Sequence, residues 1–360
     1  MKNTNTLSLT KEREHRIGKT TFIVSSFSDE SCTRKAADLI MDMLISTSQD
    51  KGGTCMITMK DDLHVIGVDM GYGNMKTANC HFPTGLTVYD CDPAFKGDVL
   101  QLGDTYYKVG EGRKPFIADK TVDNDFYIMT LAAVAMECKA NGVHDGNIHL
   151  AVGIPVSWIK EQREQLRDYI TQQKKLNFVF NGEKYKLTVK GSHIFPQGYP
   201  ALIDRLNEME GLNMLADIGN GTMNILLLSR TKVDERKCYT EKLGVEQYKI
   251  AAKNAVMDKF GKQIDICVIE EFIRNGKAHI PDHYNDVLAS EAERYAAKLM
   301  DTLYKYDYDP DFMTLYVVGG GHCLLKRYGK YDENKTVFVE DICAAAKGFE
   351  TAASIKLKSE

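Results

Sequence analysis

Hydrophobic and polar positions along the chain predict strands in pairs, followed by helices. The pattern is strand-rich from residue 63 onward and predicts strands at 63–69 and 73–80. A hairpin is expected over 100–110, turning at Gly103-Asp104, and a helix over about 125–140. The other elements expected in this half are a strand at 147–155, a helix carrying Trp158, a hairpin with an Asn-Gly turn at 178–189, a strand reaching Pro196 and a helix over 198–209.

The second half of the chain repeats this plan. Its expected strands are at 213–218, 222–229 and 314–321, and its expected helices are at about 245–259, 265–275, 286–305, after 321 and within 340–353. Strand pairs that alternate with helices in two halves predict two α/β domains around a cleft. We expect the first domain to cover 59–209 and the second to cover 210–360, with the last helix returning to the first domain.

Residues 1–58 follow a different pattern, which predicts an N-terminal extension and a linker. The stretch 20–27 is β-prone, and 46–54 is rich in the Ser, Asp and Gly of linkers. The positions of one expected helical face are Ala36, Leu39, Ile40 and Met43. The sequence "RIGKTTF" suggests a phosphate loop, but Arg13 stands where a Walker A motif needs its first glycine, so that motif is rejected.

Composition narrows the class of protein. The 360 residues are 43% hydrophobic and 27% charged, with a net charge of −4, so we expect no direct contact with nucleic acid or membrane. The chain has no long apolar run and no apolar signal core, which favours a cytoplasmic location. Its nine cysteines include no C-x-x-C, and its histidines form no ligand pair, so a transition metal held by side chains is not expected.

One short motif occurs twice. Residues 69–76 read DMGYGNMK and residues 217–224 read DIGNGTMN, and each lies between an apolar strand and a second strand. A single turn of this kind is weak evidence, because glycine turns between strands are common. Two copies 148 residues apart, one in each expected domain, are much stronger. The alternative is that both are ordinary hairpins whose glycines only satisfy turn geometry.

The residue types in the repeat suit a polyphosphate. Glycines allow backbone N–H groups to approach anionic oxygens, and two such hairpins could clamp a phosphate chain from both sides. An acid beside a phosphate is repelled unless a cation lies between them, so Asp69 and Asp217 imply Mg²⁺ held through water. Lys76 adds a positive charge suited to a phosphate oxygen.

Two further segments extend the candidate site. Gly319, Gly320 and Gly321 follow an apolar strand and precede a helix, where a sugar or base could lie against the backbone. Gln197 follows a proline at a strand end, where its amide could orient an attacking water. From position alone, Gln197 could equally be a residue that only begins a helix.

Together these residues resemble the actin-like ATPases, and most closely the plasmid-segregation branch, the ParM/StbA family. The resemblance covers about 63–356 and follows the motif order of the family: "GVDMGYGNMK", "FPQGYPA", "ADIGNGTMN", "VVGGGH" and "AAAKGF". It implies an α/β, actin-like (ribonuclease H-like) duplicated two-domain ATPase fold with a central nucleotide cleft. ParM carries glutamate at the position matching Gln197, whereas actin has glutamine.

The resemblance also implies roles for individual residues. Asp69 and Asp217 would coordinate the Mg²⁺ shell, with Gln197 positioning the hydrolytic water and these three forming the catalytic group. The cofactors would be ATP, with GTP as the alternative, and Mg²⁺. The implied nucleotide-binding residues are Gly71, Tyr72, Gly73, Asn74, Lys76, Gly219, Asn220, Gly221, Thr222, Gly244, Gly319, Gly320 and Gly321.

The family mechanism would make the chain its own partner. ATP closes the cleft, the closed form polymerises into polar filaments, and hydrolysis weakens the contacts between subunits. A DNA-binding adaptor protein would join the filament to a plasmid or another mobile element. Residues 1–58 fall outside this pattern and weakly resemble TnpW-type proteins of bacterial transposons. Two explanations are open: this segment is a fused reading frame, or translation starts at Met56 or Met59.

Other classes share this nucleotide fold. A sugar or acetate kinase usually needs a catalytic acid near the γ-phosphate, and no further acidic motif of that kind is found. A heat-shock chaperone ATPase would need a peptide-binding domain after 360. A module that binds nucleotide without hydrolysis or polymerisation would not need both acids and Gln197. The filament-forming ATPase is therefore the favoured hypothesis.

Overall fold

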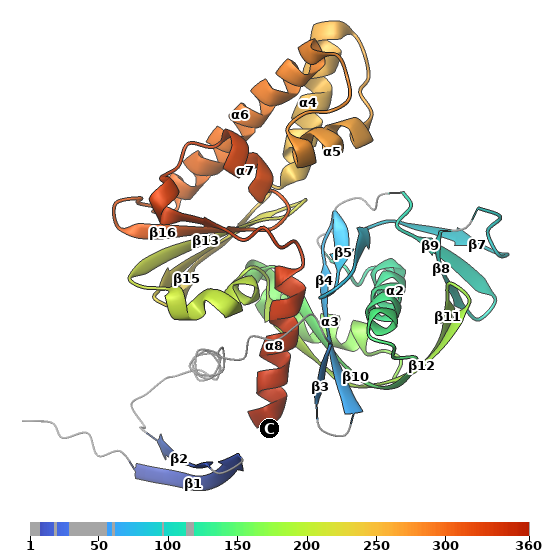
Figure 1. The fold of residues 1–360 in the computed structure, drawn as a ribbon, viewed down its shortest axis with the longest axis vertical. Helices are drawn as coiled ribbons and strands as arrows, with labels where there is room; N and C mark the ends of the chain where they lie inside the picture. The colour runs from blue at the N-terminus through green and yellow to red at the C-terminus, as the bar shows by residue number, and fades with distance from the viewer. Residues whose placement is uncertain are drawn as a thin grey trace, which may run out of the picture. The chain divides into compact units, whose positions relative to one another are not determined.

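The computed structural model describes residues 8–17, 20–28, 56–59, 62–95, 97–112 and 119–359. The chain divides into two compact units, Met1–Met43 and Leu44–Glu360. In the first unit, β1 (Ser8–Ile17) and β2 (Thr20–Ser28) form an antiparallel pair, so the β-prone stretch at 20–27 is a strand (Figure 1). The helix expected around Ala36 to Met43 and the linker at 46–54 lie outside the described residues.

The second unit contains two mixed sheets with the same central order. In the first, β6-β5-β4-β10-β12 lie side by side, with β4, β10 and β12 parallel to one another. In the second, the order is β15-β14-β13-β16-β17, with β13, β16 and β17 parallel. Each sheet therefore begins with an antiparallel meander and continues into parallel strands, and this is the duplication that the two halves of the sequence predict (Figure 1).

The first sheet has ten strands among the described residues, because β7, β8, β9 and β11 extend its edge and β3 pairs with β4. The central strands β4 and β10 are buried along most of their length. Asn181 and Gly182 both have positive φ in the predicted Asn-Gly turn between β11 and β12. The bounds are β3 (Ile57–Met59), β4 (Leu63–Met70), β5 (Asn74–Lys76), β6 (His81–Pro83), β7 (Leu86–Tyr89), β8 (Asp98–Leu102), β9 (Thr105–Val109), β10 (Asp145–Ile154), β11 (Lys175–Phe180) and β12 (Glu183–Pro196).

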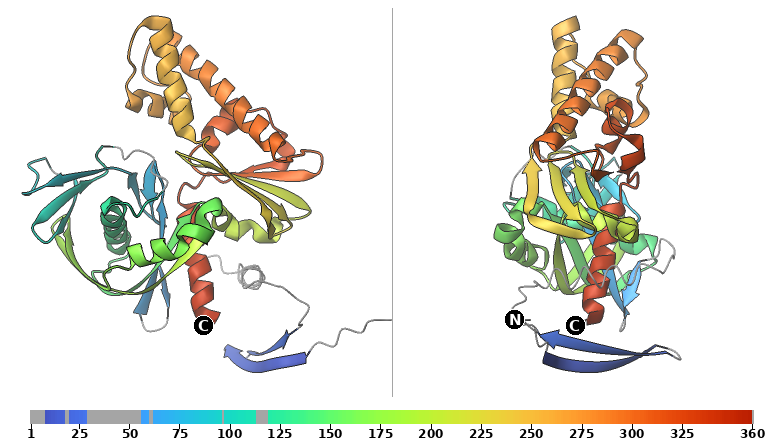
Figure 2. Two further views of the ribbon diagram at one scale, coloured as in Figure 1. Left: turned by 180° about the vertical axis from the view of Figure 1, so that it is seen from behind. Right: turned by 90° about the vertical axis from the view of Figure 1, so that its left-hand side faces the viewer.

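Helices cover both faces of the first sheet. Ile66 and Val68 of β4 belong to the core that includes α2 (Asp125–Ala140), whose bounds match the predicted helix. Gly67, between them, lies against α8 (Ala344–Ser359). Because side chains alternate along a strand, α2 and α8 pack on opposite faces (Figure 2). The helix expected to carry Trp158 begins as a 3-10 turn, η2 (Val156–Trp158), and continues as α3 (Ile159–Ile170).

Some predicted elements differ from the structure. The strand expected at 73–80 ends at Lys76 as β5, because Thr77 and Cys80 close a turn after it, and β6 begins only at His81. The strands expected at 178–189 and up to Pro196 are joined, since β12 runs on through a bulge. The helix expected at 198–209 is a 3-10 helix, η3 (Tyr199–Glu208); Pro200 lies in its first turn, and Gly348 of α8 packs against the Pro200 carbonyl.

Helices α4, α5, α6 and α7 lie on one side of the second sheet, above it in Figure 1. Leu288, Ala292 and Leu299 of α6 are buried in the same core as β13 and β16. The short strand β17 and the polar β15 were not predicted. The bounds are β13 (Leu212–Ile218), β14 (Met223–Ser229), β15 (Lys232–Glu241), α4 (Val245–Phe260), α5 (Ile266–Asn275), α6 (Asp282–Lys305), β16 (Met313–Val318), α7 (His322–Tyr328), η4 (Glu333–Lys335) and β17 (Thr336–Phe338). None of the described helices combines the length and apolar character that a membrane span requires.

The buried acid Glu350 forms a hydrogen bond between α8 and β4. Glu350 accepts a hydrogen bond from the Gly67 N–H at 3.1 Å, and only 3% of the residue is exposed. Burial, with a smaller contribution from Glu137, raises the pKa of Glu350 to about 8. The folded chain therefore holds a proton that the unfolded chain releases, so this group's contribution to stability falls as pH rises from its ordinary pKa to about 8.

Replacing Glu350 by glutamine is expected to remove that pH dependence. The amide oxygen can still accept from Gly67, and no charge has to be buried. The variant should melt at a higher temperature than the wild type at pH 8.5 and near the wild-type temperature at pH 4, as measured by circular dichroism. An equal difference in melting temperature at both pH values would contradict this account of Glu350.

Candidate nucleotide site

Two hairpin loops with the same register lie at the ends of the two central strands. Loop 1 is residues 69–76 between β4 and β5, and loop 2 is residues 217–224 between β13 and β14. Asp69 pairs across its hairpin with Lys76, and Asp217 pairs across its hairpin with Asn224. The sequence repeat is thus also a structural repeat, with an acid at the start and a polar residue opposite it in each loop.

The two loops face one cavity of about 460 Å³. Their tips touch, because a Cβ built on Gly73 would lie 2.8 Å from Cβ of Asn220. The start of α8 also reaches the cavity through Ala344 and Ala345. The predicted residues that line this cavity are Asp69, Gly71, Tyr72, Gly73, Asn74, Lys76, Gln197, Asp217, Gly219, Asn220, Gly221, Thr222, Gly319 and Gly320.

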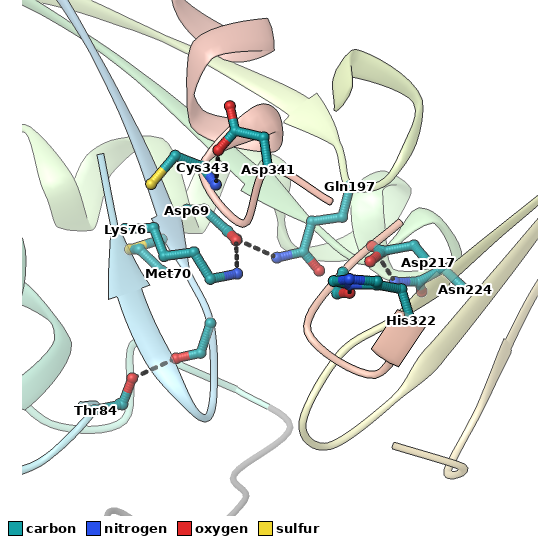
Figure 3. A network of polar contacts seen from close by, with 12 residues as sticks. Asp69, Met70, Lys76, Thr84, Gln197, Asp217, Asn224, His322, Asp341 and Cys343 are labelled. Carbon is teal, nitrogen blue, oxygen red and sulfur yellow. Dashed lines mark hydrogen bonds and ion pairs between the residues drawn. The ribbon is translucent and has the colours of Figure 1, made fainter. Parts of the chain in front are cut away.

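Asp69 is held by an ion pair and an amide. Its Oδ2 lies 2.9 Å from Nζ of Lys76, and its Oδ1 accepts from Nε2 of Gln197 at 3.4 Å (Figure 3). Burial acts to lower the pKa of Lys76, but the pair with Asp69 outweighs it, so the pKa is raised. Lys76 therefore stays charged, and Gln197 connects the end of β12 to the acid of loop 1.

Asp217 has no matching cation. The residue opposite it is Asn224, which donates from Nδ2 to Oδ2 of Asp217 at 3.3 Å. Thr240 donates to Oδ1 of Asn224 at 2.9 Å, which fixes the amide with its N–H₂ toward the acid. Burial and the nearby charge of Asp69 raise the pKa of Asp217 to about 6. The two carboxylates thus disfavour each other across the site, and a cation bound between them would relieve that repulsion.

The donor set of this site fits Mg²⁺ better than a transition metal. Nowhere in the described chain do three or more His, Cys, Asp or Glu side chains gather as a metal cage. Asp69 of loop 1 and Asp217 of loop 2 are two carboxylates that line the same cavity. Mg²⁺ keeps most of its water and usually takes one or two carboxylates together with phosphate oxygens. These two acids could hold it in that way.

Gly244 and Gly321 lie outside the cavity lining, behind loop 2. A Cβ on Gly244 would lie 2.2 Å from the Asn220 carbonyl oxygen, and a Cβ on Gly321 would lie 2.2 Å from Cγ2 of Ile218. Both glycines therefore permit close approach of backbone segments to loop 2. Gly319, which does line the cavity, has φ +84° and lies against Asp217 and the Ile218 carbonyl.

The cavity also contains residues that the sequence analysis did not identify. Lys249 of α4 is buried, and its Nζ lies 2.8 Å from Oε1 of Glu270 and 3.2 Å from Oδ1 of Asn220. Glu270 and Arg274 of α5 line the same wall. The sequence places Lys249 four residues after the predicted helix start, which could have marked it as a candidate. A charged residue near a helix start is usually exposed to solvent, however, so this signal is weak.

Comparison with known proteins shows which of them share this fold. Residues 67–199 match the family model described as "Actin like proteins N terminal domain". The archaeal actin homologue Ta0583 is 19% identical, with a TM-score of 0.66 over 80% of this chain and 98% of that one. A ParM from a 15-stranded filament of Clostridium botulinum is 16% identical, with a TM-score of 0.65 over 81% and 99%. A Bacillus thuringiensis ParM solved with ATP is 14% identical, with a TM-score of 0.57 over 82% and 98%.

None of the curated proteins matches this sequence. The similarity to solved structures covers most of this chain and nearly all of each compared chain, although few residues are identical. The family model covers only residues of the first sheet and its connections, whereas the structural similarity includes the second sheet as well. The chain therefore has an actin-like fold, shared with ParM-type and archaeal actin homologues, and its residues 67–199 match the family of actin-like N-terminal domains.

Proposed function

We propose that the protein binds and hydrolyses ATP in the cavity between loops 1 and 2, and that the bound nucleotide drives assembly into filaments. The observation that carries this proposal is the pair of loops with identical register, whose acids face one cavity together with Gln197. An archaeal actin homologue has been solved with ADP and a ParM with ATP, and ParM and Alp12 chains have been solved as filaments. Each of these is similar to the present chain in fold.

The chain's own residues divide the chemistry between them. Glycine backbone in both loops and Lys76 bind the phosphates, while Gly319 and Gly320 give the sugar and base room against the backbone. Asp69 and Asp217 would hold Mg²⁺. When bound, Mg²⁺ would neutralise charge on the phosphate oxygens. Residues 59–209 and 210–360 act as the two domains that the nucleotide draws together.

The role proposed for Gln197 is to orient the water that attacks the phosphate. Its amide already contacts Asp69, and neutral amides can orient water without trapping its proton. Replacing it by alanine is expected to slow phosphate release by roughly 10²-fold, because the attacking water loses its orientation. Nucleotide affinity should change little, since Gln197 contributes no charge to the phosphates.

This prediction is checked by phosphate release and by calorimetric titration with a nonhydrolysable ATP analogue. Loss of nucleotide binding in Gln197→Ala would contradict the role in positioning water. Transfer of the phosphate to an added sugar or to acetate by the wild type would instead indicate a kinase.

The biological role proposed is segregation of a plasmid or another mobile element, through an adaptor protein that binds DNA. This role rests on the ParM-type fold and on the mild net charge of −4, which gives the chain little attraction of its own for DNA. Polymerisation in the presence of DNA, with and without a candidate adaptor encoded nearby, tests it.

A further inference from the structure

A backbone loop that binds a polyanion must turn its carbonyl oxygens away, because each carries partial negative charge. In loop 2 this is achieved by other backbone groups. The carbonyls of residues 218, 219 and 220 accept from the N–H groups of Gly321, Val245 and Glu246 at 2.8, 3.0 and 2.9 Å. The close approach that these bonds need explains why 244 and 321 are glycines.

In loop 1 the same task falls to two side chains from outside the motif. The Met70 carbonyl accepts from Nζ of Lys120, 50 residues along the chain. The Gly71 carbonyl accepts from Oγ1 of Thr84 at 2.7 Å, a bond drawn in Figure 3. The backbone N–H of Thr84 also donates to the Gly73 carbonyl at 3.0 Å. Loop 1 is therefore held from behind by Lys120 and Thr84, which we call the carbonyl anchors.

Lys120 is an unusual residue to find in this place. It is 6% exposed, and its Nζ lies 4.7 Å from the ring centre of Tyr72 and 5.6 Å from that of Phe126. Among the residues that the structure describes, Lys120 has no ion-pair partner; its contacts there are the Met70 carbonyl and these rings. A buried ammonium without a carboxylate is costly, so a compensating role is expected.

Charge around Lys120 points to what that role is. Asp69 is close enough to favour the charged form, but Asp69 is already paired with Lys76. Burial lowers the pKa of Lys120 to about 8, which leaves it mainly protonated at neutral pH. Two lysines therefore lie at loop 1, one lining the cavity and one behind the loop, and an anion in the cavity would compensate the second.

We propose that Lys120 and Thr84 are positioning residues of the phosphate site, which turn the carbonyls of loop 1 away from the bound polyphosphate, and that Lys120 adds a second buried cation. This inference rests on the proposed nucleotide binding. It assigns to two residues, at 84 and 120, a part in that binding although neither lines the cavity.

The test compares full-length wild type with Lys120→Met and Thr84→Val. Methionine keeps most of the length of the lysine side chain without its charge, and valine keeps the shape of threonine without its donor. We expect each variant to bind ATP about ten-fold or more weakly by calorimetry. Lys108→Met is the matched control, because Lys108 is 7% exposed but pairs with Glu111 at 2.5 Å and lies outside the cavity lining.

A second measurement follows the opening of loop 1 in the protein without nucleotide. Hydrogen exchange at the amides of residues 70–76 should speed up in Lys120→Met and in Thr84→Val but not in Lys108→Met, while residues 217–224 stay unchanged. Whether the wild-type protein binds ATP tests the proposed function. Hydrogen exchange in the protein without nucleotide tests the carbonyl anchors, whether or not ATP binds. Unchanged exchange in loop 1 in both variants, or an equal loss of affinity in Lys108→Met, would overturn the proposal.

Discussion

Replacing Asp217 by asparagine is expected to stop nucleotide hydrolysis while making the folded protein more stable. Asparagine keeps the shape of the side chain and can still bond to Asn224, but it removes the negative charge that would hold the water shell of Mg²⁺. We expect phosphate release to fall by roughly 10²–10³-fold, as when a group that stabilises transition-state charge is lost.

The gain in stability has a separate cause. In the protein without ligand, burial and Asp69 both disfavour the Asp217 carboxylate, which is why its pKa is raised to about 6. A neutral amide avoids this, so the free energy of unfolding at pH 7 should rise by roughly 1–2 kcal/mol. Phosphate-release assays and urea unfolding measure the two effects. Hydrolysis at the wild-type rate would refute the assignment of Asp217, and a large loss of stability would refute the charge argument.

Replacing Gly67 by alanine is expected to cause the largest loss of stability. A Cβ there would lie 2.0 Å from the Ala346 carbonyl oxygen of α8, far inside van der Waals contact. Since both β4 and α8 are regular elements, one backbone must move away from the other. The free energy of unfolding should fall by about 3 kcal/mol. Ala344 and Ala345, at the start of α8, line the cavity, so nucleotide affinity should fall as well.

Gly320→Ala is the matched control for Gly67→Ala. It makes the same change at a glycine whose φ is not positive, and a Cβ there would meet nothing within 4 Å. Urea unfolding without nucleotide should show Gly320→Ala close to the wild type and Gly67→Ala well below it. Similar stability of the two variants would mean that α8 is not held closely against β4.

The central elements could be predicted because local pattern and tertiary role agree. The runs at 63–69 and 213–218 are apolar because β4 and β13 are the buried centres of their sheets. The helix at 125–140 was found with the bounds seen in α2. The repeated D-x-G-x-G motif predicted two matching hairpins, since an acid followed by spaced glycines leaves few other backbone choices.

Elements that depend on distant contacts could not be predicted in the same way. The helical pattern at 198–209 gives no sign of the 3-10 helix η3, which packs against α8. The close packing of Gly244 and Gly321 against loop 2 likewise depends on segments that the fold brings together. Lys120 and Thr84 carry no motif, because their function depends on where the fold brings them and not on their neighbours in sequence.

Nucleotide-driven assembly can be observed by electron microscopy of the wild-type protein mixed with ATP and Mg²⁺, together with light scattering over time. We expect filaments that form only when nucleotide is present, with scattering that decays as phosphate is released. Particles that remain single while ATP binds and is hydrolysed would contradict assembly. A protein that neither binds ATP nor assembles would contradict the whole proposed function.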